Sequence, residues 1–393
     1  MALFSESKLK KLRYPYNTAR MVSLVKAIET SDAGGKYWSK TEAEEITAEL
    51  SRETTPGSKA SDFIQKRAAL AFSRMSKRSP TLLTMKLNYG SRSLVALCLI
   101  LGSYLLGAFG ERFLSTGAEI NLFSPIYLFI FGWSLFLYAA LIILGLVSIV
   151  RRRHIEFPLR TTLAKLSDGL FAPKIITSGI RQAFLKIWTP TVLRLSQFRI
   201  ARILHWAFLA FSAGVISSII VRGLGHNYLI GWDIVGLHNS PDNVCDIFNT
   251  LFGWIPAALN LGPLPDVNTV AAMRLDRLQD AATTSAAAAA AFAPAASWLP
   301  RLFILYGVVV LIPRLLLILW DTIGIRIRSE RLPFEMDGYF ADILRTEQKY
   351  ETAVETALGG AMQNVVTASS DDARYLIEYL KRTNGGVVTF LPV

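Results

Sequence analysis

Four long apolar stretches interrupt an otherwise mixed pattern of polar and apolar residues. They run roughly from Leu94 to Gly110, from Ile126 to Val150, from Ile203 to Val221 and from Leu302 to Trp320. A hydrocarbon core about 30 Å thick is crossed by about 20 helical residues, and backbone polar groups in lipid must be satisfied within the segment. The pattern therefore predicts an all-α membrane protein with four transmembrane helices.

The basic residues are concentrated in two of the segments outside these stretches. Residues 1–90 carry 16 Lys/Arg against 9 Asp/Glu, and residues 151–202 carry 11 against 2. By contrast, residues 111–125 carry 1 against 2, and residues 222–300 carry 3 against 6. Because Lys and Arg are enriched in cytoplasmic loops, this asymmetry predicts that both termini and the 151–202 loop are cytoplasmic.

The apolar stretches divide the chain into five parts. These are a cytoplasmic helical region (1–90), a transmembrane hairpin (91–150, helices 94–110 and 126–150), a basic cytoplasmic amphipathic loop (151–202), a region with transmembrane helices 203–221 and 302–320 joined by a long outer loop (203–320, loop 222–301), and a cytoplasmic tail (321–393). Helical spacing predicts short helices over 41–50 and 61–75. In the tail, Ser370 begins a predicted helix, and residues 387–393 are strand-like.

The outer loop contains one segment whose placement the pattern leaves open. Residues 247–264 are apolar but are interrupted by Pro256 and Pro263. Such segments are typically re-entrant or interfacial, and a fifth span is the alternative. The Ala-rich run 281–296 lacks large apolar side chains, so we expect a spacer there.

Polar residues within the predicted spans are the first candidate functional residues. Arg314 follows Pro313 in the fourth span, where an arginine either snorkels to the headgroups beside a proline kink or acts as an intramembrane charge. No acidic residue lies in the other three spans to pair with Arg314. His205 begins the third span, and a proton relay there would need partners at depth, of which the sequence shows none. We therefore expect His205 to form interfacial hydrogen bonds.

Small residues recur at every fourth position on two spans. Ala210, Gly214 and Ser218 do so on the third, and Ser103 and Gly107 on the first. Such seams let helix backbones approach closely. They are expected in a helix bundle and in a homo-oligomer alike.

The formal net charge of +12 would suit a nucleic-acid partner, but many basic residues adjoin the predicted spans. Anionic headgroups attract each such residue by about 1 kcal/mol. No zinc-finger or RNA-binding signature is present. We therefore expect anionic lipid, and no nucleic acid, to contact the basic residues Arg151, Arg152, Arg153, Arg199 and Arg202.

Catalytic motifs are absent from the sequence. It contains no phosphate-binding loop, no G-x-S-x-G elbow and no H-E-x-x-H, and its four histidines are scattered. A metal site needs a convergent ligand set, which neither these histidines nor the two cysteines provide. The sequence predicts a protein that is not an enzyme and binds no cofactor or metal.

The stretch from Arg202 to Trp320 resembles an uncharacterised family of bacterial inner-membrane proteins, a domain of unknown function. The resemblance rests on the segments RILHWAFLA, YLIGW, PLPDVNTVAAMR and LYGVVVLIPRLLLILW, and on His205, Gly231, Trp232, Pro265, Arg274, Tyr306, Gly307, Pro313 and Arg314. It implies location in the bacterial inner membrane and adds Trp232 and Arg274 to the candidate residues. Because such proteins are often encoded beside a predicted GTPase, it also implies a cytoplasmic GTPase partner.

Two functions are compatible with these observations. The first is a non-enzymatic inner-membrane scaffold or anchor that recruits a cytoplasmic partner, a GTPase, into a multi-protein complex. The alternative is an oligomeric channel, or a pore-forming membrane protein of envelope stress or defence, which Arg314 and the broken 247–264 segment would suit.

Overall fold

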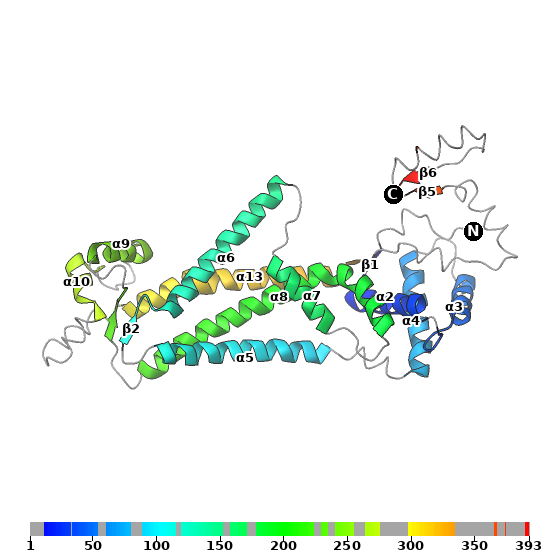
Figure 1. The fold of residues 1–393 in the computed structure, drawn as a ribbon, viewed down its shortest axis with the longest axis horizontal. Helices are drawn as coiled ribbons and strands as arrows, with labels where there is room; N and C mark the ends of the chain where they lie inside the picture. Colours follow the sequence, from blue (N-terminus) through cyan, green and yellow to red (C-terminus); the bar gives the residue numbers. More distant parts are fainter. Residues whose placement is uncertain are drawn as a thin grey trace. The chain divides into compact units, whose positions relative to one another are not determined.

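The chain forms two compact units in a computed structural model that is mostly helical (Figure 1). Unit 1 comprises Met1–Leu83, Lys174–Thr191 and Glu330–Val393, and unit 2 comprises Thr84–Pro173 and Val192–Ser329. The structure describes residues 12–32, 34–53, 60–79, 89–114, 119–151, 158–170, 178–223, 229–234, 240–254, 264–275, 298–334, 365–367, 374 and 390–392.

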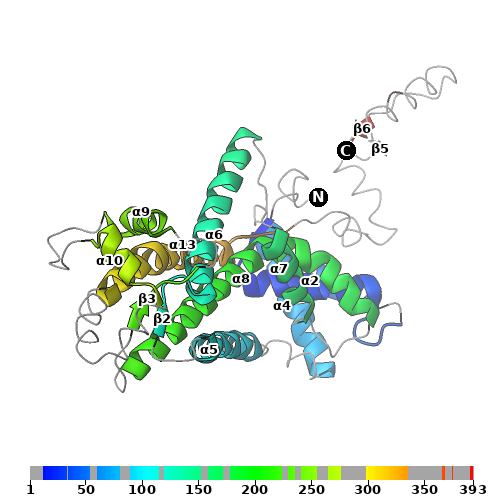
Figure 2. The same ribbon diagram turned by 60° about the vertical axis from the view of Figure 1, so that its left-hand side comes forward.

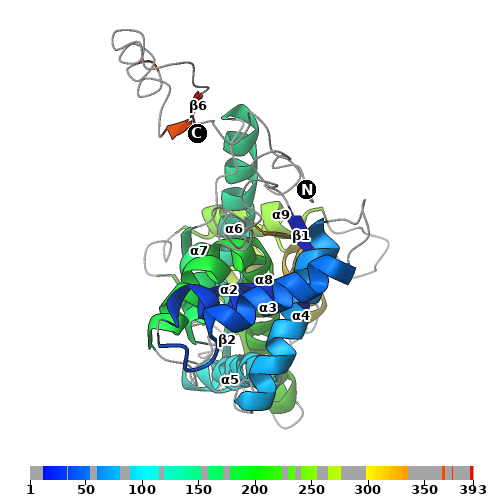
Figure 3. The ribbon, with the colours of Figure 1, turned by 90° about the vertical axis from the view of Figure 1, so that its right-hand side faces the viewer.

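Unit 1 contains a cluster of three helices with a short antiparallel strand pair. The helices are α2 (Tyr16–Ser31), α3 (Lys40–Glu53) and α4 (Ala60–Arg78), and they lie side by side in Figure 3. Strand β1 (Leu12–Tyr14) pairs with β4 (Leu332–Phe334). The Tyr14 ring packs edge-on against Phe334 at 6.1 Å, and burial raises the pKa of its hydroxyl.

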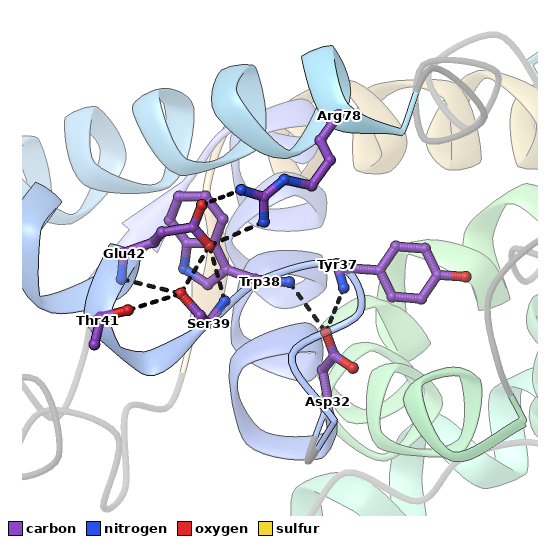
Figure 4. A network of polar contacts seen from close by, with 7 residues as sticks. All are labelled: Asp32, Tyr37, Trp38, Ser39, Thr41, Glu42 and Arg78. Carbon is purple, nitrogen blue, oxygen red and sulfur yellow. Dashed lines mark hydrogen bonds and ion pairs between the residues drawn. The ribbon is translucent and has the colours of Figure 1, made fainter.

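The turn between α2 and α3 is held by carboxylates that accept backbone hydrogen bonds (Figure 4). Asp32 Oδ2 accepts from the amides of Tyr37 at 2.6 Å and Trp38 at 3.0 Å. Ser39 and Glu42 form a capping box, since the Glu42 amide donates to Ser39 Oγ at 3.3 Å and the Ser39 amide donates to Glu42 Oε2 at 3.0 Å. The helices predicted over 41–50 and 61–75 are confirmed as α3 and α4.

Two arginines of α4 connect it to its neighbours. Arg78 donates both arms of its guanidinium to Glu42, at 2.6 and 3.1 Å. The amide of Ser39, together with the Ser39 hydroxyl and Arg78, lowers the pKa of Glu42. Arg67, which is 4% exposed, donates to Glu29 of α2 at 3.1 Å and to Thr47 of α3 at 2.9 Å. The three helices thus share a polar anchor as well as an apolar core.

The C-terminal part of unit 1 contains a parallel strand pair. Strand β5 (Val365–Thr367) pairs with β6 (Phe390–Pro392), and Val366 faces Leu391 in the register. Parallel strands require a crossover connection, and Arg374 within that connection is helical. The strand-like terminus predicted for residues 387–393 is confirmed over Phe390–Pro392. The rest of the helix predicted from Ser370 lies outside the described residues.

Unit 2 is built from long helices. They are α5 (Tyr89–Leu114), α6 (Pro125–Val150), the part of α8 (Ser178–Gly223) from residue 192 onward, and a helical run Trp298–Ser329 that contains the π-helical turn η4 (Gly307–Leu311) and α13 (Ile312–Ser329). The shorter α7 (Pro158–Leu170) lies against α8, because Ser196 donates to Asp168 and Gln197 donates to Thr161, both at 2.9 Å.

One end of unit 2 carries a small cap made of short elements, seen together in Figures 1 and 2. Strand β2 (Glu119–Asn121) pairs in parallel with β3 (Leu229–Gly231), next to α9 (Pro241–Phe252) and α10 (Val267–Ala272). The cap has an apolar core whose largest members are Phe248, Phe252, Trp232 and Trp298. Aromatic burial on this scale fixes the ends of the long helices.

Four helices of the described chain are long and apolar enough to cross a membrane, by length and composition alone. They are Ser93–Gly110, Pro125–Val150, Ser178–Val221 and Trp298–Ser329. Large apolar side chains are exposed along them. The second half of α6 diverges from its neighbours in Figure 1, and it exposes Ile142, Ile143, Leu146, Ile149 and Val150.

Two glycines bring α5 and α8 into backbone contact. A Cβ at Gly107 would overlap the Phe211 carbonyl oxygen, and a Cβ at Gly214 would overlap the Tyr104 carbonyl oxygen. The seam predicted from small residues is therefore confirmed at these two positions. The reason is steric, since only glycine permits helix axes to approach this closely.

The predicted helix boundaries differ most from the observed ones at the start of the third span and at the end of the fourth. Residues 178–202, expected to belong to a loop, are continuous with the predicted third span in α8. Its buried residues continue at helical spacing past Pro190, at Ile180, Phe184, Trp188, Val192 and Leu195. The fourth predicted span ended at Trp320, whereas the helix continues to Ser329. That extension brings Asp321 into the helix.

The structure shows the conformation of the first part of segment 247–264, whose placement the sequence left open. Its first residues form the end of α9, an amphipathic helix that buries Val244, Cys245, Phe248 and Phe252 and ends at Gly253. Residues 255–263 and the Ala-rich run 281–296 lie outside the described residues.

Candidate functional site

A buried polar cluster in unit 2 unites residues from three long helices. Arg314 of α13, His205 of α8 and Ser134 of α6 are each at most 2% exposed. Asp321, two turns after Arg314 on the same helix, is 3% exposed. Polar groups buried to this degree among apolar helices need partners, so their mutual geometry decides what the cluster does.

Arg314 is at the centre of this buried polar cluster. Its Nη1 lies 3.1 Å from His205 Nδ1, and its Nη2 donates to Ser134 Oγ at 3.5 Å. The guanidinium carbon stacks 4.0 Å from the centroid of the Phe208 ring, a cation–π contact. Arg314 therefore does not snorkel to a surface, and that expectation was wrong. Its side chain lies between α13, α6 and α8, where Ser134 and His205 are its partners.

The contact between Arg314 and His205 assigns the protonation of the imidazole. A guanidinium only donates hydrogen bonds, so Nδ1 of His205 must accept. The imidazole is therefore neutral, with its proton on Nε2. That Nε2 lies 3.7 Å from Asp321 Oδ2. His205 is thus a buried link between an arginine and a carboxylate, not the interfacial residue that the sequence predicted.

Three polar atoms of this cluster have no hydrogen-bond partner among the residues that the structure describes. They are Arg314 Nε, His205 Nε2 and Asp321 Oδ2. Two of these atoms, His205 Nε2 and Asp321 Oδ2, face each other across the 3.7 Å gap. A donor and an acceptor held apart in a buried site can exchange a proton after a small closure.

Other cations lie near Asp321. Arg160 of α7 and Arg202 of α8 both interact electrostatically with its carboxylate. Burial lowers the pKa of Arg160, and the Asp321 carboxylate acts in the opposite direction.

Pro313 explains the local geometry before Arg314. In an α-helix the amide of residue 313 would bond the carbonyl of Val309, but proline has no amide hydrogen. The Tyr138 hydroxyl of α6 donates to that Val309 carbonyl at 3.1 Å. The turn before Pro313 is π-helical, and the Ile312 amide bonds the carbonyl of Gly307. The predicted proline effect is thus present as a π-turn that α6 stabilises.

Removing the Tyr138 hydroxyl should be costly only while proline occupies position 313. We expect Tyr138→Phe to lower the free energy of unfolding by about 1–2 kcal/mol, because the Val309 carbonyl loses its donor. In a Pro313→Ala background the new amide can supply the missing bond, so the same change should cost about half as much or less. Chemical unfolding of the four proteins measures this cycle, and equal costs in both backgrounds would contradict the assignment.

The other two candidate residues, Trp232 and Arg274, meet in the cap. They form an isolated parallel bridge, and the Trp232 amide donates to the Met273 carbonyl at 3.1 Å. The Trp232 indole is fully buried and donates to the Val270 carbonyl at 2.7 Å. These contacts are those of a structural residue that fastens β3 to α10.

Of the basic residues expected to face lipid, the structure describes Arg151, Arg199 and Arg202. Arg151 is exposed at the end of α6, whereas Arg199 and Arg202 of α8 are half-buried, and Arg202 interacts with Asp321. Arg152 and Arg153 lie outside the described residues.

Sequence reasoning missed Asp321, Ser134 and Tyr138. Asp321 directly follows Trp320 and was assigned to the tail, although its spacing of seven from Arg314 places both on one face of a continuous helix. Ser134 and Tyr138 are common residue types in apolar helices and carry no signal. No group of three metal-ligating residues is found within the described ranges.

Comparison with known proteins places a similarity in the C-terminal part of unit 1. Residues 334–393 match the family described as the SMC proteins Flexible Hinge Domain. Chromosome partition protein Smc of Halothermothrix orenii and that of Bacillus subtilis are each 50% identical over 56 residues, which cover 14% of this chain and 5% of the relative. The Desulfitobacterium hafniense protein is 46% identical over 59 residues. No solved structure matches the chain.

This similarity overturns several predictions. The supposed membership of an uncharacterised inner-membrane family was wrong, since the relatives are chromosome partition proteins. For the same reason the inner-membrane scaffold, the channel, the GTPase and lipid partners, the exclusion of nucleic acid and the inner-membrane location were wrong. The basic charge was interpreted as a signal for lipid, and nothing in the local pattern of the acidic tail indicated its similarity to the SMC hinge. The chain spans about 5% of the length of these curated relatives, so the similarity concerns residues 334–393.

Proposed function

We propose that this protein acts in chromosome partition and that residues 334–393 serve there as a hinge-type module that pairs with another such module. The observation that carries the proposal is the match of these residues to the SMC hinge, at 50% identity to two chromosome partition proteins. Half of the aligned positions are shared, which is far more than short compositional bias produces.

The strand geometry supports pairing. Strands β5 and β6 form a two-stranded parallel sheet, and no third strand joins it in the part of the chain that the structure describes. Strands of three residues are too short to be stable as an isolated pair. An edge of this kind is completed by a strand from a partner, through backbone hydrogen bonds.

The charge of the module supports a protein partner over direct contact with DNA. Residues 334–393 contain more acidic than basic residues, namely Glu335, Asp337, Asp342, Glu347, Glu351, Glu355, Asp371, Asp372 and Glu378 against Arg345, Lys349, Arg374, Lys381 and Arg382. DNA phosphates repel such a segment. Any contact with DNA is therefore assigned to the basic parts of the chain.

Pairing is tested with the full chain and with a chain ending at Phe334, which retains β4. Two differently labelled copies of each are mixed in mild detergent, and co-diffusion is measured. We expect the full chain to pair and the truncated chain to lose pairing. Val366→Pro removes a backbone donor from β5 and should act like the truncation, whereas exposed Arg374→Ala should pair normally.

The cellular part of the proposal has its own readout. In the native host, the truncation and Val366→Pro should both raise the fraction of cells that lack DNA, while Arg374→Ala should not. If the truncated chain pairs as well as the full chain, or if cells carrying it segregate DNA normally, the proposal is overturned.

We also propose that the four long apolar helices cross a lipid bilayer. Their lengths suit the hydrocarbon thickness, and their exposed Leu, Ile and Phe side chains form a surface far larger than water tolerates on a monomer. Extraction of host membranes with alkaline carbonate tests this part. The chain should stay in the pellet, and its release into the supernatant would overturn the spanning arrangement.

A further inference from the structure

Two buried polar atoms with no hydrogen-bond partner among the described residues face each other in unit 2, outside the module that carries the proposed function. They are His205 Nε2 and Asp321 Oδ2, which lie 3.7 Å apart on side chains that are only 3% and 4% exposed. A direct N–H···O hydrogen bond needs about 2.7–3.2 Å, so the two atoms do not pair with each other at this separation. A buried polar group without a partner is destabilising, so both atoms need one.

We propose that one ordered water molecule binds between His205 and Asp321 and joins α8 to α13. Arg314 Nη1 donates to Nδ1 of His205, which leaves the imidazole proton on Nε2. An ionised carboxylate only accepts hydrogen bonds. The water oxygen therefore accepts from Nε2–H of His205, and one of the water hydrogens is donated to Oδ2 of Asp321.

The separation of the two atoms suits a water that lies to one side of the line between them. With two hydrogen bonds of about 2.8 Å, the 3.7 Å separation gives an angle of about 80° at the water oxygen. This angle is narrower than the tetrahedral value, and the broad angular preference of a carboxylate oxygen accommodates it. Polar separations above about 3.5 Å are the range in which a bridging water replaces a direct hydrogen bond.

The chemistry of the surrounding groups favours water over an ion. An anion would face the carboxylate of Asp321 and be repelled. A metal cation needs at least three protein ligands, and the described ranges hold no group of three metal-ligating residues. It would also bind an imidazole whose other nitrogen lies 3.1 Å from the Arg314 guanidinium. Water is uncharged, and two to four polar partners are enough to hold it in a buried site.

The bound water completes a series of polar contacts across three helices. The series runs from Ser134 of α6 to Arg314 of α13 and His205 of α8, and then through the water to Asp321. Among the described residues Arg314 has no carboxylate at hydrogen-bond distance. The imidazole and the water thus connect its buried positive charge to the negative charge of Asp321. Buried charges are tolerated when they are paired and their remaining polar atoms are satisfied.

Proton NMR of the full-length protein in mild detergent, with nitrogen-15 in histidine and tryptophan, tests the site in the wild-type chain. The His205 Nε2–H signal, identified by its loss in His205→Gln, should show a cross-peak to water. A rotating-frame experiment gives opposite signs for a bound water and for proton exchange with solvent. The Trp232 indole N–H is the matched control, since it is fully buried but donates directly to the Val270 carbonyl at 2.7 Å. It should show no water cross-peak.

Asp321→Glu tests the position of the water. The 3.7 Å gap exceeds a hydrogen bond by only about 0.5–1 Å, so a carboxylate on a side chain one methylene longer reaches Nε2 directly. We expect the variant to keep the His205 Nε2–H signal and to lose its water cross-peak.

The proposal has two results that would overturn it. The first is a wild-type His205 Nε2–H that shows no water cross-peak or shows only the sign of exchange, and it needs no folded variant. The second is a cross-peak that stays unchanged in folded Asp321→Glu. Neither result bears on pairing through residues 334–393, so the two proposals fail separately.

Discussion

Replacement of Gly214 by alanine should disrupt the packing of α5 on α8. The new Cβ would overlap the Tyr104 carbonyl oxygen and lie 2.9 Å from the Ala108 amide nitrogen. Both obstacles are backbone atoms, so no side-chain rotation relieves the overlap and the helices must separate. We expect the free energy of unfolding to fall by about 3 kcal/mol or more. Gly107→Ala, which meets the Phe211 carbonyl, should have an effect of the same size.

Gly102 provides the matched control, since it lies on the same helix as Gly107 and a Cβ added there would have no atom within 4 Å. Gly102→Ala should leave stability unchanged or raise it by up to about 1 kcal/mol, because alanine favours helix. Unfolding by denaturing detergent, followed by circular dichroism, compares the three variants. A Gly214→Ala protein as stable as the Gly102→Ala protein would rule out the close helix crossing.

Loss of the Arg314 side chain is the second large effect. Arg314→Ala removes the stacking on Phe208 and both hydrogen bonds, and it leaves Nδ1 of His205 without a donor in a buried site. A desolvated cation–π contact contributes about 2 kcal/mol, and an orphaned buried acceptor costs about 1–3 kcal/mol. We expect a total destabilisation of about 3 kcal/mol or more. Arg314→Lys should recover only part of this stability, because lysine keeps the positive charge but lacks the forked donor geometry of arginine.

Arg328 is the control for this experiment. It lies on the same helix and stacks on Phe198 of α8 at 4.3 Å, but it is only half-buried. Exposed cation–π pairs contribute about 0.5–1 kcal/mol, so Arg328→Ala should cost no more than that. If the two alanine variants unfold at the same denaturant concentration, the buried cluster is not a centre of stability.

Regular periodicity and composition predicted much of the helical framework. The helices over 41–50 and 61–75, the four long apolar helices and the close approach at Gly107 and Gly214 all follow from local pattern. Backbone hydrogen bonding and side-chain size act over a few residues, so the sequence shows them directly. The prediction that the chain is not an enzyme stays a prediction.

The buried polar cluster could not be predicted from local pattern in the same way. Arg314 and His205 were each singled out, but His205 was denied an acidic partner because the fourth helix was expected to end at Trp320. The helix continues because its apolar face repeats through Ile318 and Gly324 into the last turn. Ser134 and Tyr138 lie far away in sequence, and only the packing of α6 makes them partners of Arg314 and Val309.

The functional prediction failed for a different reason. Net charge and the length of apolar stretches indicate whether water or lipid surrounds a segment. Neither indicates which proteins the chain is related to. The acidic segment 334–393 carries no periodic signal as strong as that of the spans, yet it is the part that matches the SMC hinge.

By itself, the sequence determined the number and approximate position of the apolar helices, the glycine seam and the sign of the charge in each connection, because these depend on residues close together in the chain. The tertiary structure alone decided that Arg314, His205 and Asp321 share one buried site and that Tyr138 supplies the donor that Pro313 lacks. Those contacts join helices separated by many residues. Burying these polar groups costs desolvation free energy, which their mutual hydrogen bonds offset, and no single segment supplies both partners.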